Sequence, residues 1–180
     1  LAAADESFIV FTGDREEYKY SDPLYVRNNG ENRVAYCYNA SKKVPPTWQE
    51  GGQTVYKIES ATAEEFYQMT DENVRVMEPE AFKKAILSVC YQGFPQNGSG
   101  LMEKYGLTRA TFRCITQLAV WYYTDSLDIS QYYQQYQPFD TYPGAWAAYQ
   151  ELITPLDTLP LGYQLDLYRN RNEQYQNVLC

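Results

Sequence analysis

Apolar and polar residues alternate with period two towards both ends of the chain, which is the pattern of half-buried β-strands. The segment 24–39, LYVRNNGENRVAYCYN, alternates on both sides of Asn29-Gly30, a pair typical of a tight hairpin turn. This pattern places Cys37 on the second strand of the hairpin. Segment 53–60 predicts a further strand, and segment 164–179 predicts a late hairpin with Asn and Arg at its turn.

The middle of the chain follows the helical period instead. Segment 79–93 has Pro in its first turn, repeats apolar residues at helical spacing and stops at Gly93, so it predicts a capped helix. After a loop at 94–100, Thr108 is the expected N-cap of a second helix whose body is RCITQLAVWYYTD, 113–125. Shorter helices are predicted at 61–69 and 143–153. Strands and helices are thus segregated along the chain, which indicates an α+β fold.

Nothing in the sequence splits the chain, because it contains no internal repeat and no Gly/Ser-rich linker. We therefore expect one domain over 1–180. The opening LAAADES, 1–7, is typical of the end of a signal cleavage region or of a cloning remnant, and we expect it to lie outside the fold.

Composition limits the classes of partner that the chain is expected to bind. The 180 residues carry a formal charge of -8, which argues against nucleic acid and against an anionic membrane surface, and favours a cationic partner group. No apolar run is long enough to cross a bilayer, so we expect no membrane insertion. Tyrosine, at 19 residues, is far more frequent than in an average protein.

Histidine is absent, which removes the usual Ser-His-Asp and Cys-His catalytic pairs and most zinc sites. The four cysteines show no C-x-x-C spacing, so neither a metal nor another cofactor is predicted, although two disulfides are possible by count. Cys90 and Cys114 lie within helical apolar patterns and are interpreted as core residues.

Gln117 is the unusual residue of the second helix. One stripe of that helix is apolar, and the face that carries Gln117 also holds Cys114 and Trp121, so we expect burial on both sides. A buried amide without partners costs about 1–3 kcal/mol. Either the amide hydrogen-bonds to a neighbouring strand, or a thiol has displaced its ammonia and left an intramolecular Cys–Gln thioester.

Two motifs together carry a family resemblance. YCYN at 36–39, followed downstream by TQLAVW at 116–121, resembles the thioester domains, also called TQXA domains, of Gram-positive surface adhesins and pilus tips. The resemblance covers most of 24–126 and implies that Cys37 and Gln117 are the bonding pair. It also implies a β-rich body, sandwich or barrel-like, joined by the thioester to a helical subdomain at roughly 61–153. The three further cysteines depart from what the family leads us to expect, and they could pair or compete with Cys37.

The resemblance implies covalent adhesion. A lysine of a host surface or extracellular-matrix protein would attack the thioester, leaving an amide on Gln117 and a free thiol on Cys37. Each domain would act once and would not be an enzyme. The chain would be monomeric as an isolated domain, extracellular, and held at the cell surface through regions outside these residues. The lysine must lose a proton, and without histidine a tyrosine, a carboxylate or water remains the candidate acceptor.

Neighbours of the pair have weaker assignments. Tyr36, Tyr38 and Trp121 are candidates for walling the bond from water, although ordinary packing explains them equally well. Asn39, Thr116 and Ala119 belong to the motifs and are expected to position the pair.

Other functions remain open at this point. The tyrosine-rich segment 132–142 suits a noncovalent module that binds glycans or proteins. A stalk domain with a Lys–Asn or Lys–Asp isopeptide bond, or a cysteine hydrolase, is a further alternative. Replacing Cys37 by Ala separates these functions, because a noncovalent module tolerates the change and covalent capture does not.

Overall fold

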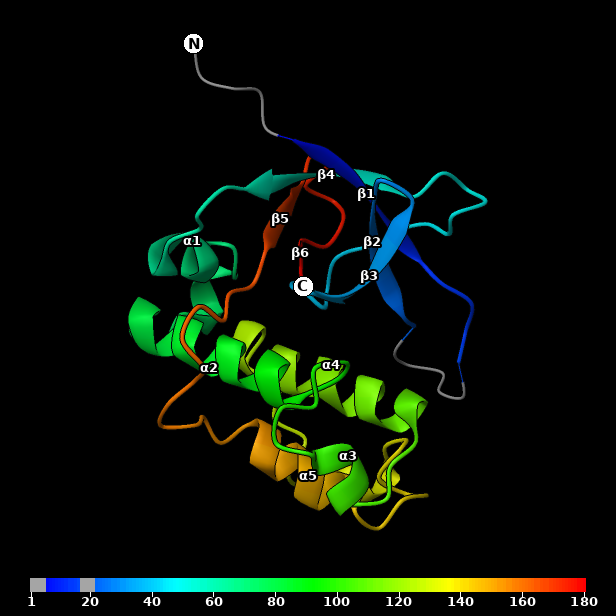
Figure 1. Cartoon of the computed structure of the whole chain (residues 1–180), viewed down its shortest axis with the longest axis vertical. Helices are drawn as coiled ribbons and strands as arrows, with labels where there is room; N and C mark the ends of the chain where they lie inside the picture. Colours follow the sequence, from blue (N-terminus) through cyan, green and yellow to red (C-terminus); the bar gives the residue numbers. More distant parts are fainter. Residues whose placement is uncertain (1–5, 17–21) are drawn as a thin grey trace.

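The structure, a computed structural model, describes residues 6–16 and 22–180 and consists of a β-barrel packed against a helical part (Figure 1). Within these residues the barrel strands are β1 Ser7–Thr12, β2 Leu24–Asn28, β3 Glu31–Cys37, β4 Gln53–Ile58, β5 Leu167–Asn170 and β6 Val178–Leu179. They follow the closed order β1-β2-β3-β6-β5-β4, and all neighbouring strands are antiparallel. The predicted α+β fold is confirmed. The β-rich body, expected to be a sandwich or barrel-like, is a barrel.

The predicted hairpin is formed by β2 and β3, paired from Leu24 opposite Ala35 to Asn28 opposite Glu31. Asn29 and Gly30 both have positive φ, 50° and 79°, as a two-residue turn of this hand requires. The turn therefore fixes the register that brings Cys37 to the end of β3.

The start of the chain differs from the prediction. Ser7, which we expected to lie outside the fold, begins β1, and the carbonyl of Glu6 accepts a hydrogen bond from Lys57 N–H at 3.2 Å. Residues 1–5 of the same segment lie outside the described residues. The sequence pattern did not predict β1, because Phe8 to Phe11 is a continuous apolar run, in which strand and helix have the same signature.

The helices occupy the middle of the chain: α1 Ala63–Gln68, α2 Pro79–Gln92, α3 Leu101–Lys104, α4 Arg109–Thr124 and α5 Ala145–Leu152, with short 3-10 turns at Glu72–Val74 and Tyr133–Gln135. The Thr108 side chain accepts a hydrogen bond from Thr111 N–H, which confirms it as the N-cap of α4. Pro79 and Gly93 bound α2 as expected. Helix α3 was not predicted. In the described part of the chain, no helix has the length and apolarity that crossing a bilayer requires.

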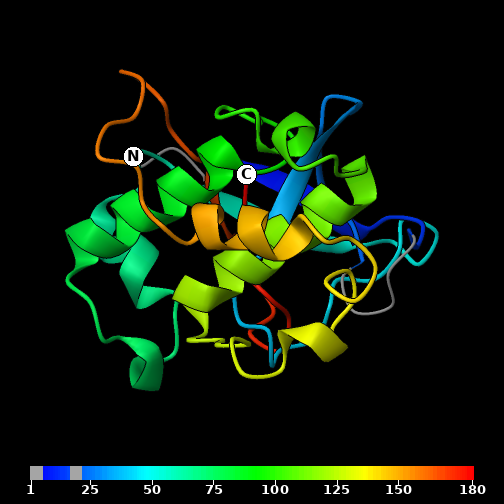
Figure 2. The ribbon, with the colours of Figure 1, turned by 90° about the horizontal axis from the view of Figure 1, so that it is seen from below.

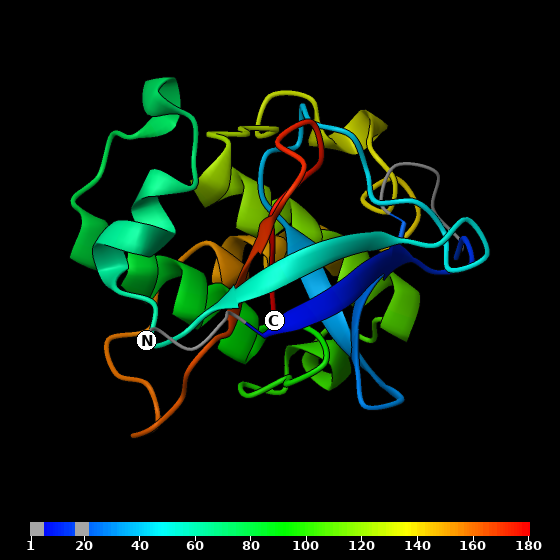
Figure 3. The same cartoon turned by 90° about the horizontal axis from the view of Figure 1, so that it is seen from above.

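Helix α4 occupies the central position of the molecule, in contact with strand β3 on one side and with α2 and α5 on the other (Figures 1 and 2). Figure 3 shows the molecule from above the view of Figure 1, with the barrel in front of the helices and the late strand β5 beside the early strand β4. Because α4 has protein on both sides, its apolar residues extend nearly all round it, as the sequence indicated.

The alternation of β3 divides its side chains between two cores. Ala35 and Cys37 belong to the cluster inside the barrel, whereas Tyr36 belongs to the larger cluster of the helical part. Tyr38, just past the strand, also joins the helical cluster. Strand β3 is thus the wall shared by the two cores, and its last residue is Cys37.

Candidate functional site

Cys37 and Gln117 contact each other across the junction of barrel and helices. Cys37 N–H donates to Gln117 Oε1 at 3.0 Å, and Gln117 Nε2 donates back to the Cys37 carbonyl at 3.1 Å. The thiol Sγ lies 3.3 Å from the same Oε1. Both polar atoms of a side chain that is only 3% exposed are therefore satisfied by one residue, 80 positions away in the sequence.

This arrangement joins the two interpretations of Gln117. The amide does hydrogen-bond to a neighbouring strand, and its partner on that strand is the cysteine whose sulfur lies beside the amide carbonyl. The Cys37 N–H also points at the oxygen on which negative charge would develop during attack at this carbonyl, so it is placed as an oxyanion donor.

Burial controls the acidity of the thiol. Cys37 is 4% exposed, and this burial raises the pKa of its thiol well above the usual range. The carboxylate of Asp125 raises that pKa further, while the Trp121 indole and the Arg113 guanidinium lower it. In the unreacted protein Cys37 is therefore a neutral thiol at physiological pH, in a site from which water is largely excluded.

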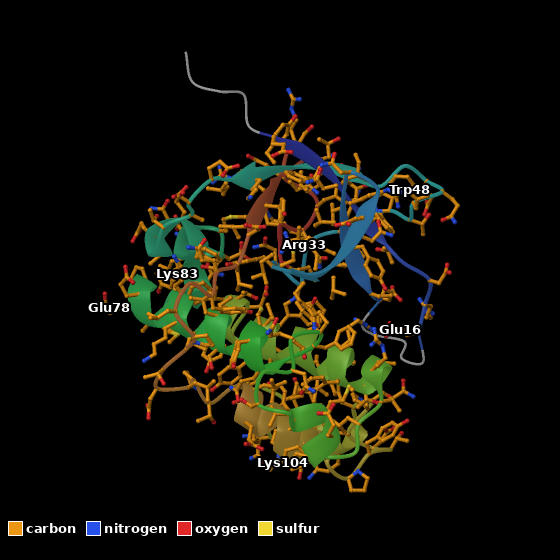
Figure 4. The ribbon with its side chains drawn as sticks, in the orientation of Figure 1. Glu16, Arg33, Trp48, Glu78, Lys83 and Lys104 are labelled. Atoms are coloured by element: carbon orange, nitrogen blue, oxygen red, sulfur yellow. The ribbon has the colours of Figure 1, made fainter. Side chains whose placement is uncertain are left out.

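Three residues of α4 and its C-cap, each about one turn after the last, face the barrel part; we call Arg113, Gln117, Trp121 and Asp125 the barrel-facing row. Arg113 Nε donates to Glu16 at 2.7 Å, and Glu16 lies on the barrel side of α4 (Figure 4). Asp125 Oδ1 accepts the Ala40 N–H at 2.9 Å, three residues after Cys37. The row is buried at Arg113 and Gln117 and half-buried at Trp121 and Asp125.

Trp121 follows Gln117 by one helical turn and packs against both hydrophobic clusters. Its indole Nε1 is buried and has no hydrogen-bond partner. A buried N–H without an acceptor is uncommon. The indole also lowers the pKa of Cys37, as a nearby hydrogen-bond donor does, so the indole and the thiol are neighbours although no hydrogen bond joins them.

Tyr36 and Tyr38 use their hydroxyls to hold the strand to the helical part. Tyr36 donates to the carbonyl of Phe94, and Tyr38 donates to the carbonyl of Phe66 at 3.3 Å. Burial raises the pKa of both phenols well above the ordinary value. Their rings lie in the helical cluster, on the opposite side of β3 from the cluster that contains Cys37.

Asn39 fixes the chain as it leaves the site. It has a positive φ of 57°, its Nδ2 donates to the Met69 carbonyl at 3.0 Å, and its Oδ1 accepts from Asn177 at 3.1 Å. Asn tolerates this left-handed conformation better than most residues. Asn39 therefore joins the end of β3 to α1 and to the approach of β6.

Thr116 and Ala119 contact the helical part of the molecule. Thr116 Oγ1 donates to Phe112 O at 2.7 Å and accepts the Phe94 N–H at 3.1 Å, while Ala119 is fully buried in the helical cluster. A Cβ at Gly93 would lie 2.5 Å from the Thr116 methyl, so the end of α2 approaches α4 closely only because residue 93 is glycine.

The three further cysteines form no disulfide with Cys37. No disulfide joins any of the four cysteines, all of which lie in the described part of the chain. Cys90 and Cys114 are buried, as predicted for core residues, and Cys180 is half-buried.

The tyrosine-rich segment 132–142 packs on α5. Tyr133 stacks on Trp146 with ring centroids 3.8 Å apart, and Phe139 meets the same indole edge-on at 5.6 Å. Tyr132 is the exposed ring of this segment. Much of the aromatic surface that suggested a stacking platform is thus used for internal packing.

Asp125 is the site residue that sequence reasoning missed. Its signals were its position two turns after Gln117 and its place at the negative end of a long helix, where a carboxylate is unfavourable. Neither signal indicates by itself that the carboxylate contacts the strand exit at Ala40.

Comparisons with known proteins agree with this geometry. The model of the thioester domain family matches residues 34–157, a range that contains both Cys37 and Gln117. The pilus tip adhesin Cpa of Streptococcus pyogenes is 31% identical over 177 residues, covering 89% of this chain and 26% of the adhesin. The chain therefore spans about a quarter of the length of that relative.

Solved structures share the whole architecture. The N-terminal thioester domain of a surface protein from Clostridium perfringens has a TM-score of 0.81 and 27% identity, with 97% of each chain covered. The N-terminal domain of the Streptococcus pyogenes pilus tip adhesin Cpa has a TM-score of 0.79 and 25% identity, covering 99% of this chain and 94% of that domain. Because the family model covers well over half of the chain and solved thioester domains share its fold, this chain belongs to the thioester domain family.

Proposed function

We propose that this domain attaches covalently to an amine of a host surface or extracellular-matrix protein, by way of a thioester between Cys37 and Gln117. The observation that carries the proposal is the mutual hydrogen bonding of the two residues, with Sγ 3.3 Å from Oε1. The relatives named as surface proteins and as a pilus tip adhesin support an extracellular role at a cell surface.

The thioester forms when the Cys37 thiol replaces ammonia on the Gln117 carbonyl. Sγ attacks the Gln117 carbonyl carbon, the C–N bond breaks, and the nitrogen leaves with the thiol proton as ammonia. The Cys37 N–H stabilises the oxyanion in between. Two buried amide donors disappear in this reaction, and strand β3 becomes covalently linked to helix α4.

Capture of the partner reverses the roles. A neutral amine, most simply the side chain of a lysine, attacks the same carbon and the C–S bond breaks. The electron pair remains on Cys37 Sγ, which takes one proton from the amine nitrogen and becomes a thiol. The amide product is far less reactive than the thioester, because an amine is a much poorer leaving group than a thiol. The domain is consumed by one event and so is a single-use trap and not an enzyme.

The surroundings suit a bond that must survive until a partner arrives. Burial of Cys37 and Gln117 keeps water from the carbonyl. The excess of acidic residues attracts cationic amines over longer distances, an effect that salt screens. A monomeric domain held at the cell surface by regions outside this chain is consistent with such a role.

The test is the intact mass of freshly purified protein before and after incubation with methylamine. We expect a mass short of the sequence value by one ammonia, and after incubation the mass of one methylamine adduct located at Gln117. Cys37→Ala and Gln117→Ala variants should have their full sequence masses and form no adduct.

A native mass equal to the sequence, without an adduct, would contradict the proposal and favour a noncovalent binding module. An isopeptide-linked stalk would also lack one ammonia or one water, but it would not react with methylamine and would keep its deficit in Cys37→Ala. Repeated turnover of an acyl substrate would instead indicate a hydrolase.

A further inference from the structure

The proposed capture reaction requires a proton acceptor, because an alkylamine is mostly protonated at neutral pH. The chain has no histidine. The two tyrosines that flank Cys37 are unsuitable, since both hydroxyls are buried and already donate to backbone carbonyls, and burial opposes their ionisation. Of the acceptors that the sequence leaves open, a carboxylate near the pair and water remain, and a carboxylate is the one that the structure can place.

Asp125 lies at the solvent end of the barrel-facing row. It is half-buried, as is Trp121, whereas Gln117 and Arg113 are closed from solvent. Its Oδ1 accepts the Ala40 N–H at 2.9 Å, and its Oδ2 accepts the Thr124 hydroxyl at 2.6 Å. The carboxylate is thus held in place between the exit of β3 and the end of α4, on the side from which the row is open.

The position is unfavourable for a purely structural acid. Asp125 follows the last residue of a 16-residue helix, where the backbone carbonyls already present negative charge, and its own N–H donates to Trp121 O. Sites at which local preferences are violated are often functional. A cationic visitor would relieve this accumulation of negative charge.

We propose that Asp125 receives the attacking amine, binding its ammonium group and taking one proton from it before the nitrogen attacks the Gln117 carbonyl. The inference rests on the proposed function and adds the residue that prepares the nucleophile. The Coulombic effect of Asp125 on Cys37 supports the proximity that this role requires.

The proton balance is closed. The ammonium gives one proton to Asp125, and the neutral nitrogen forms the C–N bond as the carbonyl becomes an oxyanion held by the Cys37 N–H. Collapse breaks the C–S bond, and Sγ takes the second proton from the nitrogen to become a thiol. Asp125 then releases its proton to solvent. The products are an amide at Gln117 and a thiol at Cys37.

The charges around Asp125 favour this exchange. Burial raises the pKa of its carboxyl, and the negative charge of Asp71 raises it further, while hydrogen bonds from Thr124 and Ala40 act in the opposite direction. Arg113, further along the row, is paired with Glu16. A carboxylate whose pKa is raised is a stronger base towards an ammonium group.

The test compares two nucleophiles on Asp125→Asn, which retains an acceptor oxygen for the Ala40 N–H. Methylamine is protonated at neutral pH, and hydroxylamine is not. Second-order adduct rates are measured by intact mass for wild type and variant at pH 7, with hydroxylamine as the nucleophile that needs no base. We expect the variant to lack one ammonia like wild type, to react with methylamine roughly 100-fold more slowly, and to react with hydroxylamine at nearly the wild-type rate.

Asp128→Asn is the matched control. Asp128 is an exposed carboxylate near the end of the same helix, and it accepts a local hydrogen bond from the Ser130 N–H. It should react like wild type with both nucleophiles. Unchanged methylamine rates in Asp125→Asn, or equal slowing with both nucleophiles, would overturn the role of Asp125 as proton acceptor. A wild-type mass without the ammonia deficit would instead overturn the thioester on which the inference rests.

Discussion

The backbone of Cys37 and the side-chain amide of Gln117 form two hydrogen bonds, one in each direction, across 80 residues of sequence. The Gln117 amide hydrogen-bonds to the backbone at the end of β3 as a neighbouring strand would. This pairing brings Cys37 Sγ to 3.3 Å from Gln117 Oε1. These hydrogen bonds would hold the two reactants of the proposed thioester in place before it forms, and such positioning is a large contribution that a protein can make to an intramolecular reaction.

The proposed thioester should act as a staple between barrel and helices. Closing a loop of 80 residues would stabilise by up to about 4 kcal/mol, by analogy with disulfides of similar span. We expect methylamine-treated wild type, which has lost the cross-link but no side-chain packing, to melt at a lower temperature than untreated protein in calorimetry. Identical melting of the two samples would show that the cross-link adds no stability.

Asn39→Ala should weaken the junction beside Cys37. The variant loses the hydrogen bonds to Met69 O and Asn177 and places Ala at a positive φ of 57°. Each lost buried hydrogen bond costs about 1 kcal/mol, so we expect destabilisation of roughly 2–3 kcal/mol in urea denaturation, with slower loss of ammonia during maturation.

Asn39→Gly separates the two contributions, because glycine adopts the left-handed conformation without strain but also lacks the side-chain amide. It should recover only the strain component. Full recovery of stability in the glycine variant would exclude a role for the Asn39 hydrogen bonds.

Trp121→Phe keeps most of the apolar packing and removes the indole N–H. Since a hydrogen bond to a charged group is worth about 1.5–3 kcal/mol, loss of this donor should slow expulsion of the Cys37 thiolate roughly tenfold or more. Coupling to hydroxylamine and to methylamine should slow together, because both reactions expel the same sulfur. Wild-type rates for both would contradict the role of the indole.

Asp125→Asn should also change how stability depends on pH. The folded protein holds the pKa of Asp125 above its unfolded value, so folding favours the protonated acid, and its stabilising effect is lost as pH rises through the folded pKa. We therefore expect the variant to be more stable than wild type at pH 7, with the difference shrinking as pH falls to about 4. Chemical denaturation at several pH values measures this difference in stability. The pKa of the Asp128 carboxyl is lowered, so Asp128→Asn should show the opposite trend and be less stable than wild type at pH 7.

Local chemistry determined much of the fold. Asn29-Gly30 specifies the hairpin, Thr108 caps α4, and Pro79 with Gly93 bounds α2, because each feature depends on residues only a few positions apart. The burial of Gln117 was also predictable, since a helix that is apolar nearly all round must have protein on both sides.

Tertiary structure alone decided what depends on distant contacts. The barrel closes because β6 pairs with β3, placing Leu179 opposite Tyr36, and no local pattern indicates that pairing. The same closure pairs Cys37 with Val178 at the end of β3, where the Cys37 N–H contacts Gln117 of α4, whereas the two motifs by themselves suggested the pair only through family resemblance. Asp125 became a site residue because the chain leaving β3 returns its Ala40 N–H to the end of α4. Sequence fixes local conformation through short-range sterics and hydrogen bonds, but positions 80 residues apart meet only when the whole chain packs.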